Sequence, residues 1–142
     1  MKRITAIALF AAATTLGLGT AFAQGYAVRA TMPFDFTVGS KTLPAGNYKI
    51  NNFHSDLIEI QNLDKDASVL SVTFSDDAQS KNGGAVLIFD KCGDQYFLRE
   101  VLAGSAGSMN VNLPLSKAEQ RARQQESMAK VTQVSVPLTA GY

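Results

Sequence analysis

After residue 25 the chain alternates between short runs rich in β-branched and aromatic residues and turns rich in Gly, Pro, Asn and Asp. Runs of this length, apolar at every second position, are typical of strands in antiparallel sheets. Their spacing predicts a mainly β fold: a single antiparallel β-sandwich or small partly open barrel of about seven to nine short strands. The predicted strands cover residues 26–32, 34–38, 48–52, 57–61, 68–74, 85–89, 95–102 and 109–113.

The most apolar strand covers residues 85–89, which include no polar side chain. A strand that is apolar on both faces belongs in the middle of a sheet, covered on each side. Residues 90–94 predict a turn, and residues 95–102 predict the returning strand of a hairpin. We expect this hairpin to form the centre of the fold.

Apolar and hydroxyl side chains alternate in residues 68–74: Leu70, Val72 and Phe74 lie on one side, Ser71 and Thr73 on the other. This alternation predicts a strand with one face packed on the core and the other in water. Earlier in the chain, Pro33 has no N–H to give to a ladder, so it predicts an edge strand or a kink between two strands.

One surface helix is predicted near the C-terminus, where Ser116 and Glu119 form a capping box. Residues 117–130 contain no Gly or Pro, and the pairs 119/123 and 126/130 join Glu to Arg or Lys at the favourable i,i+4 spacing. Its apolar positions are few: Ala118, Ala122, Met128 and Ala129. So narrow a stripe predicts a peripheral, solvated helix that covers a sheet edge, with a partner-binding helix as the alternative.

Residues 131–142 alternate again and end in Tyr142. They fit a closing strand of the same sheet or a loose tail, a strand donated to a neighbouring subunit, or the last strand of an outer-membrane barrel. A spanning barrel needs at least eight strands of about 9–11 residues, and most strands predicted here are shorter. A closing strand of the same sheet or a loose tail is therefore favoured over a donated strand and over a barrel strand.

The first 23 residues have the layout of a secretory signal peptide: a basic start, an uncharged apolar run, and the cleavage motif Ala21-Phe22-Ala23. We expect cleavage before Gln24 and export to the periplasm or the cell exterior; a membrane anchor is the alternative. The domain organisation then reads 1–23 signal peptide, 24–113 β-domain, 114–130 helix and 131–142 C-terminal strand or tail. No transmembrane segment is expected in the mature chain.

Charge and composition narrow the range of partners. Without Lys2 and Arg3, 11 of the 13 basic residues remain against 12 acidic ones, so the mature net charge is −1. Nucleic-acid binding and a polybasic membrane contact therefore have no electrostatic basis. Cys92 is the single cysteine, so no intramolecular disulfide forms, and we expect it to be a small residue in the turn before Gly93.

The sequence predicts no catalytic, cofactor-binding or metal-binding residues, and no cofactor. His54 is the only histidine and is expected in a turn; a Cys92–His54 nucleophile pair has no local support. The acidic segments at residues 64–66 and 76–77 are too sparse for a Ca²⁺ loop and are expected to be solvated turns. The motifs of phosphate loops, serine hydrolases and zinc proteases are missing from the sequence.

Four blocks of the sequence resemble a family of small secreted bacterial proteins of uncharacterised function: VRATMPFDFTVG (28–39), LPAGNY (43–48), GDQYFLREV (93–101) and LPLSKAE (113–119). The resemblance spans about residues 28–119 and implies export and a single domain. Family members often carry a bulky aromatic residue after the third block, where this chain has Leu102. The family supplies no activity, cofactor or catalytic residue.

We therefore expect an exported, non-enzymatic β-domain that binds an unknown partner protein or envelope component. One alternative is a small-ligand carrier with an apolar cavity, and another is an assembly subunit that donates its C-terminal strand. The oligomeric state does not follow from the sequence.

Overall fold

The computed structural model describes residues 27–75, 77, 83–103, 109–125 and 131–140. Within these ranges lie twelve strands and one helix: β1 (Ala27–Met32), β2 (Phe36–Val38), β3 (Lys41–Leu43), β4 (Gly46–His54), β5 (Leu57–Asn62), β6 (Ser68–Val72), β7 (Phe74–Ser75), β8 (Val86–Cys92), β9 (Gln95–Leu102), β10 (Asn110–Asn112), α1 (Lys117–Gln125), β11 (Thr132–Pro137) and β12 (Thr139–Ala140). The prediction of a mainly β fold is confirmed. The predicted signal peptide lies outside the described residues.

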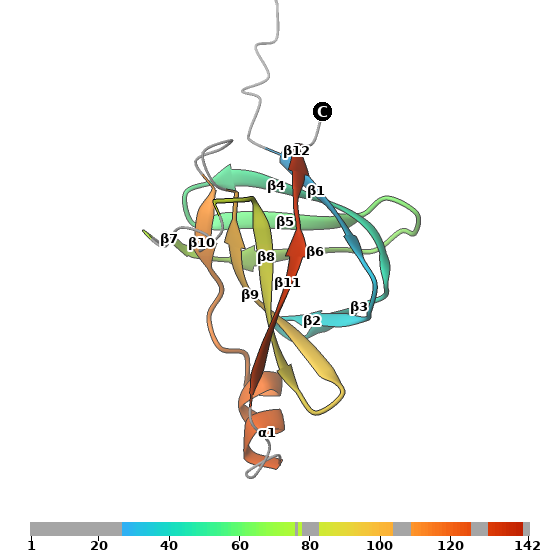
Figure 1. Ribbon diagram of the computed structural model, residues 1–142, viewed down its shortest axis with the longest axis vertical. Helices are drawn as coiled ribbons and strands as arrows, with labels where there is room; N and C mark the ends of the chain where they lie inside the picture. The colour runs from blue at the N-terminus through green and yellow to red at the C-terminus, as the bar shows by residue number, and fades with distance from the viewer. Residues whose placement is uncertain (1–26, 76, 78–82, 104–108, 126–130, 141–142) are drawn as a thin grey trace, which may run out of the picture.

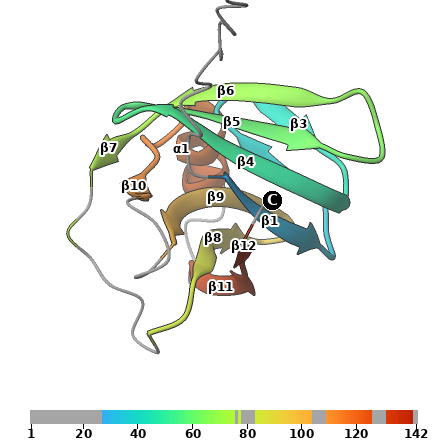
Figure 2. The ribbon, with the colours of Figure 1, turned by 90° about the horizontal axis from the view of Figure 1, so that it is seen from above.

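The strands form two sheets whose directions cross in Figure 1. The first sheet has the order β12-β1-β4-β5-β6, and the second has the order β11-β8-β9-β10-β7 with the β2–β3 hairpin attached to β9. All strand pairs are antiparallel except β2 with β9, which meet at Thr37 and Phe97. Seen from above, the sheets face each other across the core (Figure 2).

Two segments pass from one sheet to the other. After Thr73, the chain leaves β6 in the first sheet and enters β7, which pairs with β10. After Leu138, it leaves β11 and enters β12, which pairs with β1. Strands that switch sheets make the corners of orthogonal packings, and here they join a curled, open half-barrel sheet to a second sheet. These corners divide the predicted strand at 68–74 into β6 and β7 and the C-terminal segment into β11 and β12.

The core between the sheets is made of large apolar side chains. Phe36 packs edge-on against both Tyr48 and Phe89, with ring centroids 5.1 and 5.5 Å apart. Phe34 lies flat on Tyr96 with ring centroids 3.8 Å apart. These contacts tie the β2–β3 hairpin to both sheets, and no disulfide contributes because the single cysteine is free. Burial of apolar surface is therefore the main stabilising term.

The hairpin predicted at the centre is β8 and β9, and β8 lies between β11 and β9 as expected. Leu87 and Phe89 are fully buried, whereas Val86 and Ile88 on the other face are half-buried. The predicted turn at 90–94 is too long, because the structure has the turn at residues 93 and 94 only. Asp90 and the two residues after it continue β8, because ion pairs satisfy the Asp90 carboxylate within the sheet.

The strand boundaries elsewhere follow the sequence closely. Pro33 separates β1 from β2, which confirms the predicted kink. Gly39, at φ 61°, makes the turn between β2 and β3. Asn62, which ends β5, accepts hydrogen bonds from the backbone of Asp64 and Lys65, each at 2.8 Å, and so forms the predicted turn after β5.

For residues 68–74 the alternation is confirmed but the predicted wet face is wrong. Leu70 and Val72 face the solvent, while Val69 packs on the core and Thr73 is buried at the corner. The register of β6 with β5 explains why Leu70 and Val72 face the solvent. Val69 pairs with the buried Ile60, so the side chains next to it in β6 must point outward.

Helix α1 begins as predicted, with the backbone N–H of Glu119 donating to Oγ of Ser116 at 3.1 Å. The expected reach of the Glu119 carboxylate back to the cap does not occur, because this carboxylate binds two arginines. The predicted solvated helix is therefore wrong on one face, where Glu119 and Ala122 are buried. Residues 126–130 of the predicted helix lie outside the described residues.

The C-terminal segment pairs with its own chain. β11 pairs with β8, and β12 pairs with β1, while Val136 and Leu138 contribute to the core. This is the arrangement expected of a closing strand.

Candidate functional site

The outer surface of β6 and β7 carries the most exposed large apolar side chains of the described residues. Leu70, Val72 and Phe74 are 61%, 55% and 59% exposed. Leu57, half-buried on β5, pairs with Val72 and extends the apolar surface to the neighbouring strand. Scattered exposed apolar residues are ordinary, but three in one continuous segment form a patch, and apolar patches mark interaction sites.

β6 is also an end strand of the first sheet, because it pairs with β5 alone among the described strands. The hydrogen bonds show which backbone groups face the free edge. Thr73 N–H bonds to the carbonyl of Asp56 on the β5 side at 2.8 Å, whereas the Ser68 carbonyl accepts from Nζ of Lys41 at 2.7 Å. Because backbone groups alternate in direction along a strand, Ser68, Leu70 and Val72 present their N–H and C=O groups to the free edge.

Within Ser68–Val72 no charged residue or proline blocks pairing at this edge, although Lys41 of β3 donates to the Ser68 carbonyl and Ser71 Oγ donates to the Val72 carbonyl. Exposed edges in native proteins are usually protected by charged side chains, proline or a bulge. The strand reads Ser-Val-Leu-Ser-Val, without charge or proline, and its register with β5 is continuous. The edge therefore offers an uncharged strand with an apolar outer face. We refer to Ser68–Val72 together with Phe74 as the β6 edge.

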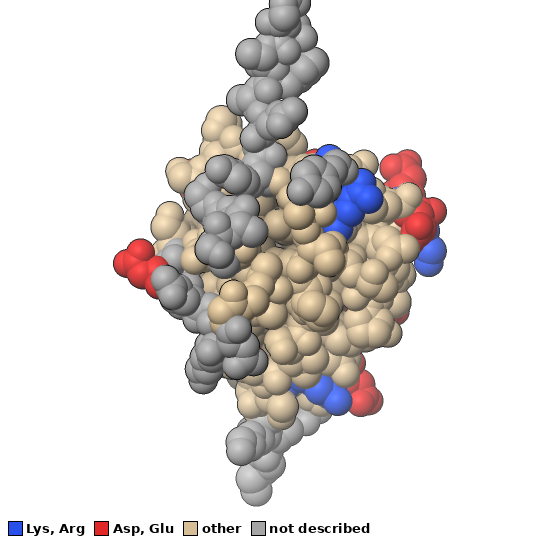
Figure 3. Space-filling view, turned by 45° about the horizontal axis from the view of Figure 1, so that its top comes forward, with Lys and Arg blue, Asp and Glu red and all other residues tan. Residues whose placement is uncertain are grey.

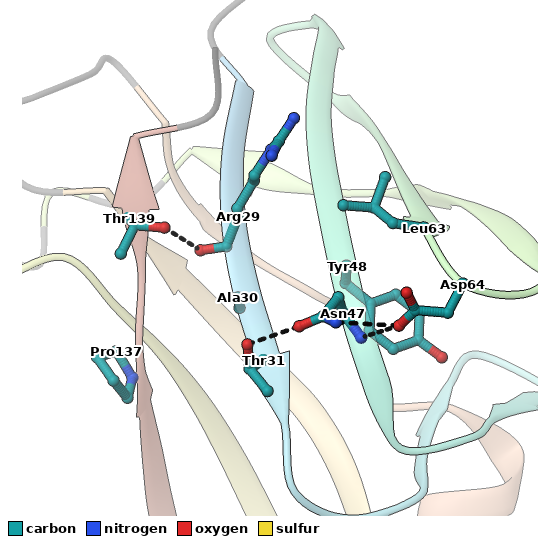
Figure 4. Close-up of a pocket in the computed structure, with 9 residues that line it drawn as sticks. All are labelled: Arg29, Ala30, Thr31, Asn47, Tyr48, Leu63, Asp64, Pro137 and Thr139. Carbon is teal, nitrogen blue, oxygen red and sulfur yellow. Dashed lines mark hydrogen bonds between the residues drawn. The ribbon is translucent and has the colours of Figure 1, made fainter.

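A groove lies beside β1, in the half of the first sheet that is away from β6 (Figure 4). This groove has a volume of about 440 Å³ and is lined by both polar and apolar residues. Thr31 Oγ1 donates to Oδ1 of Asn47 at 2.8 Å, and Asn47 Nδ2 donates to Oδ2 of Asp64 at 3.1 Å. Thr139 from β12 forms the opposite wall, and its Oγ1 donates to the Arg29 carbonyl at 3.4 Å.

Under helix α1, two arginines bind two buried carboxylates, and the arginine side chains of residues 99 and 123 are 14% and 36% exposed. Arg99 Nε donates to Oδ2 of Asp90 at 2.9 Å, and its Nη2 binds Oε1 of Glu119. Arg123 Nη2 donates to the same two oxygens at 2.8 and 2.7 Å. The hydrogen bond with Glu119 is the main reason that the pKa of Arg123 is raised, although burial opposes it. The paired charges balance, so the cluster anchors α1 on the second sheet.

Cys92 and His54, the two residues considered as a nucleophile pair, do not come together. His54 is the exposed last residue of β4 rather than a turn residue, whereas Cys92 is buried at the end of β8, beside Phe97 and Ala122. They lie in different sheets. Asp64 is committed to Asn47, and Asp76 lies outside the described residues. Across the described part of the chain, no group of three or more His, Cys, Asp or Glu side chains is placed to hold a metal ion.

The sequence reasoning missed the β6 edge because it assigned Leu70 and Val72 to the core. A usable signal was present: residues 68–72 carry neither charge nor proline although they lie next to two polar loops. On the face shown in Figure 3, the described charged side chains lie in separate groups with uncharged surface between them.

Comparison with known proteins finds no match for this chain among protein-family models, curated proteins or solved structures. In the part of the chain that the structure describes, no helix has both the length and the apolar character needed to cross a membrane.

Proposed function

We propose that the protein is an exported, non-enzymatic β-domain that binds a partner protein along the β6 edge. The observation that carries the proposal is the exposed apolar row of Leu70 and Val72 on a strand whose outer backbone edge is unpaired among the described strands. An extended segment can add to such an edge, where backbone hydrogen bonds supply affinity and alternate side chains supply specificity. The signal-peptide pattern of residues 1–23 supports export.

The test compares matched leucines. Leu70→Lys places a charge on the β6 edge, while Leu63→Lys makes the same change at a leucine that is 44% exposed outside that edge. Both variants should fold, since neither side chain is buried. Wild type and both variants are used as baits for the envelope fraction of the producing cells, and bound proteins are quantified by mass spectrometry. A partner retained by wild type and Leu63→Lys but lost by Leu70→Lys supports the proposal; equal capture by all three baits contradicts it.

The groove beside β1 favours a second candidate, a small polar ligand. Its volume of about 440 Å³ lies within the range of small-molecule sites, and hydroxyl, amide and carboxylate groups line it. A ligand of this kind should raise the melting temperature of wild type. Thr139→Val should reduce that shift, because it removes one lining hydroxyl. The expected apolar cavity of a carrier differs in character from this groove, whose lining is mixed.

A further inference from the structure

The β6 edge has different chemistry at its two ends, and this difference determines what can pair with it. At the Ser68 end, the Lys41 ammonium lies against the Ser68 carbonyl at 2.7 Å. Lys41 is exposed, and the described ion pairs do not include it. At the other end lies the apolar ring of Phe74, 59% exposed. The edge therefore has an ammonium group at the Ser68 carbonyl where β6 begins and an apolar ring where β6 ends, and the turn before Ser68 adds Asp64, Lys65 and Asp66.

We propose that the β6 edge binds an extended segment that runs antiparallel to β6 and carries a carboxylate at its C-terminal end, beside Lys41. This inference rests on the proposed function. An antiparallel strand would place its last residues next to Ser68, where the Lys41 ammonium attracts a carboxylate. A parallel strand carrying its own N-terminal amine would place that amine there, next to a like charge. Lys41 therefore favours one direction of binding.

The side-chain preferences follow from the direction of the backbone groups. Because Ser68, Leu70 and Val72 face the free edge, each would form a hydrogen-bonded pair with the residue directly opposite it. Opposite residues share a face of the sheet, so partner residues next to Leu70 and Val72 would also point outward. Apolar side chains there would cover the exposed row. The Ser68 carbonyl keeps the capacity for a second bond, since a carbonyl oxygen has two lone pairs.

The preferred ligand is thus an extended segment with apolar residues at two alternate positions, followed within a few residues by Glu, Asp or a terminal carboxylate. In a second copy of β6 the nearest acidic residues, Asp76 and Asp77, come only after Phe74 and Ser75, which leave the first sheet and pair with β10, so that strand has no carboxylate to place beside Lys41. The charge at Lys41 therefore points to a different chain rather than to a symmetric dimer.

The test uses synthetic peptides and fluorescence anisotropy with the full mature chain. The probe is acetyl-Val-Thr-Val-Thr-Thr-Glu-Gly amide, compared with versions in which the Glu is Gln or Lys and with a version whose Glu stands at the N-terminal end. The Glu peptide should bind about two- to fivefold more tightly than the Gln peptide, as expected for an exposed ion pair, and the difference should shrink in salt. Lys41→Glu should reverse the order and favour the Lys peptide.

The controls separate this inference from the proposed function. Lys117→Glu makes the same charge change at the exposed first residue of α1, which packs on β8 in the second sheet, and should leave the preference for Glu unchanged. Binding of all peptides with equal affinity, unaffected by Lys41→Glu but lost in Leu70→Lys, would overturn the inference and leave the proposed function standing. If no peptide binds, and if no partner separates Leu70→Lys from Leu63→Lys in the envelope experiment, both are overturned.

Discussion

Arg99 donates from Nε to Oδ2 of Asp90 at 2.9 Å and from Nη1 to the backbone carbonyl of Leu113 at 3.0 Å. One side chain on β9 thus binds the adjacent strand β8 and the segment that leads into α1. It also binds Glu119, whose side chain is 2% exposed. A single arginine therefore links three parts of the chain and, together with Arg123, balances the charge of two buried carboxylates.

Arg99→Ala should lower the free energy of unfolding by about 3–5 kcal/mol, because Arg123 alone then faces two buried carboxylates and one negative charge is left unbalanced. Urea denaturation followed by circular dichroism measures the change. Arg121→Ala is the matched control: this arginine lies on the exposed face of α1 and should cost no more than about 0.5 kcal/mol. Equal losses in the two variants would show that the cluster does not anchor the helix.

Because Tyr48 is buried, we expect the free energy of unfolding to fall in alkali. Its side chain is fully buried, and its hydroxyl donates to the Pro44 carbonyl at 2.5 Å. Burial, the largest cause, raises the pKa of Tyr48 above 10.0, although a hydrogen bond with Asn62 opposes it. The folded state therefore holds this proton more tightly than the unfolded state, so the stabilisation is complete below pH 10 and is lost as the pH rises above it.

Unfolding free energies measured by urea between pH 8 and pH 11 test this sign. The fall above pH 10 should be steeper in wild type than in Tyr48→Phe, which has no phenol to ionise. Tyr96→Phe serves as the control, since Tyr96 is only half-buried. A steeper fall in Tyr48→Phe than in wild type would contradict the assignment.

Cys92 should be protected from thiol reagents in the folded protein. It is 3% exposed and packs beside Phe97 and Ala122 under α1. Ellman's reagent should react slowly with native protein and completely in denaturant. Ser55→Cys in a Cys92→Ala background is the matched control, because residue 55 is exposed. Comparable rates at the two positions in the folded state would mean that α1 does not cover Cys92.

Phe89→Ala should destabilise the fold by about 3–5 kcal/mol, since Phe89 is fully buried and contacts both Phe34 and Phe36. Leu70→Ala should change stability by no more than about 0.5 kcal/mol, because Leu70 is 61% exposed. Thermal and urea unfolding of the two variants compare core and edge directly. A large loss on Leu70→Ala would place this side chain in a buried contact and remove the basis of the proposed site.

Ending the chain after Lys130 should prevent formation of a stable monomer. The deletion removes the strand next to β8 and the strand next to β1, together with the buried Val136 and Leu138. Size-exclusion chromatography and circular dichroism test this result, with removal of residues 141–142 alone as the control. If the shortened chain stays a soluble, cooperatively folded monomer, the segment neither closes its own sheets nor serves as a donated strand.

The sequence predicted the positions of the strands better than it predicted which face of each strand is buried. The predicted strands at 57–61 and 85–89 fall on β5 and β8, because runs of β-prone residues between turn signals mark strands locally. Periodicity does not say which face meets the core. Leu70 faces solvent because Val69 pairs with Ile60, a contact between strands that spacing within one strand does not reveal. Glu119 was expected to cap its helix, yet a partner twenty residues earlier, Arg99, binds it instead.

The pairing of the last two strands determines when the fold can be completed. β11 and β12 supply a border to each sheet, and β12 does so by pairing with β1 at the opposite end of the described chain. Neither sheet is complete until residue 140 is free to move. A chain still emerging from a ribosome therefore keeps two unfinished edges, and the final fold forms only after release. Contacts of such long sequence separation also slow the closure of the two sheets.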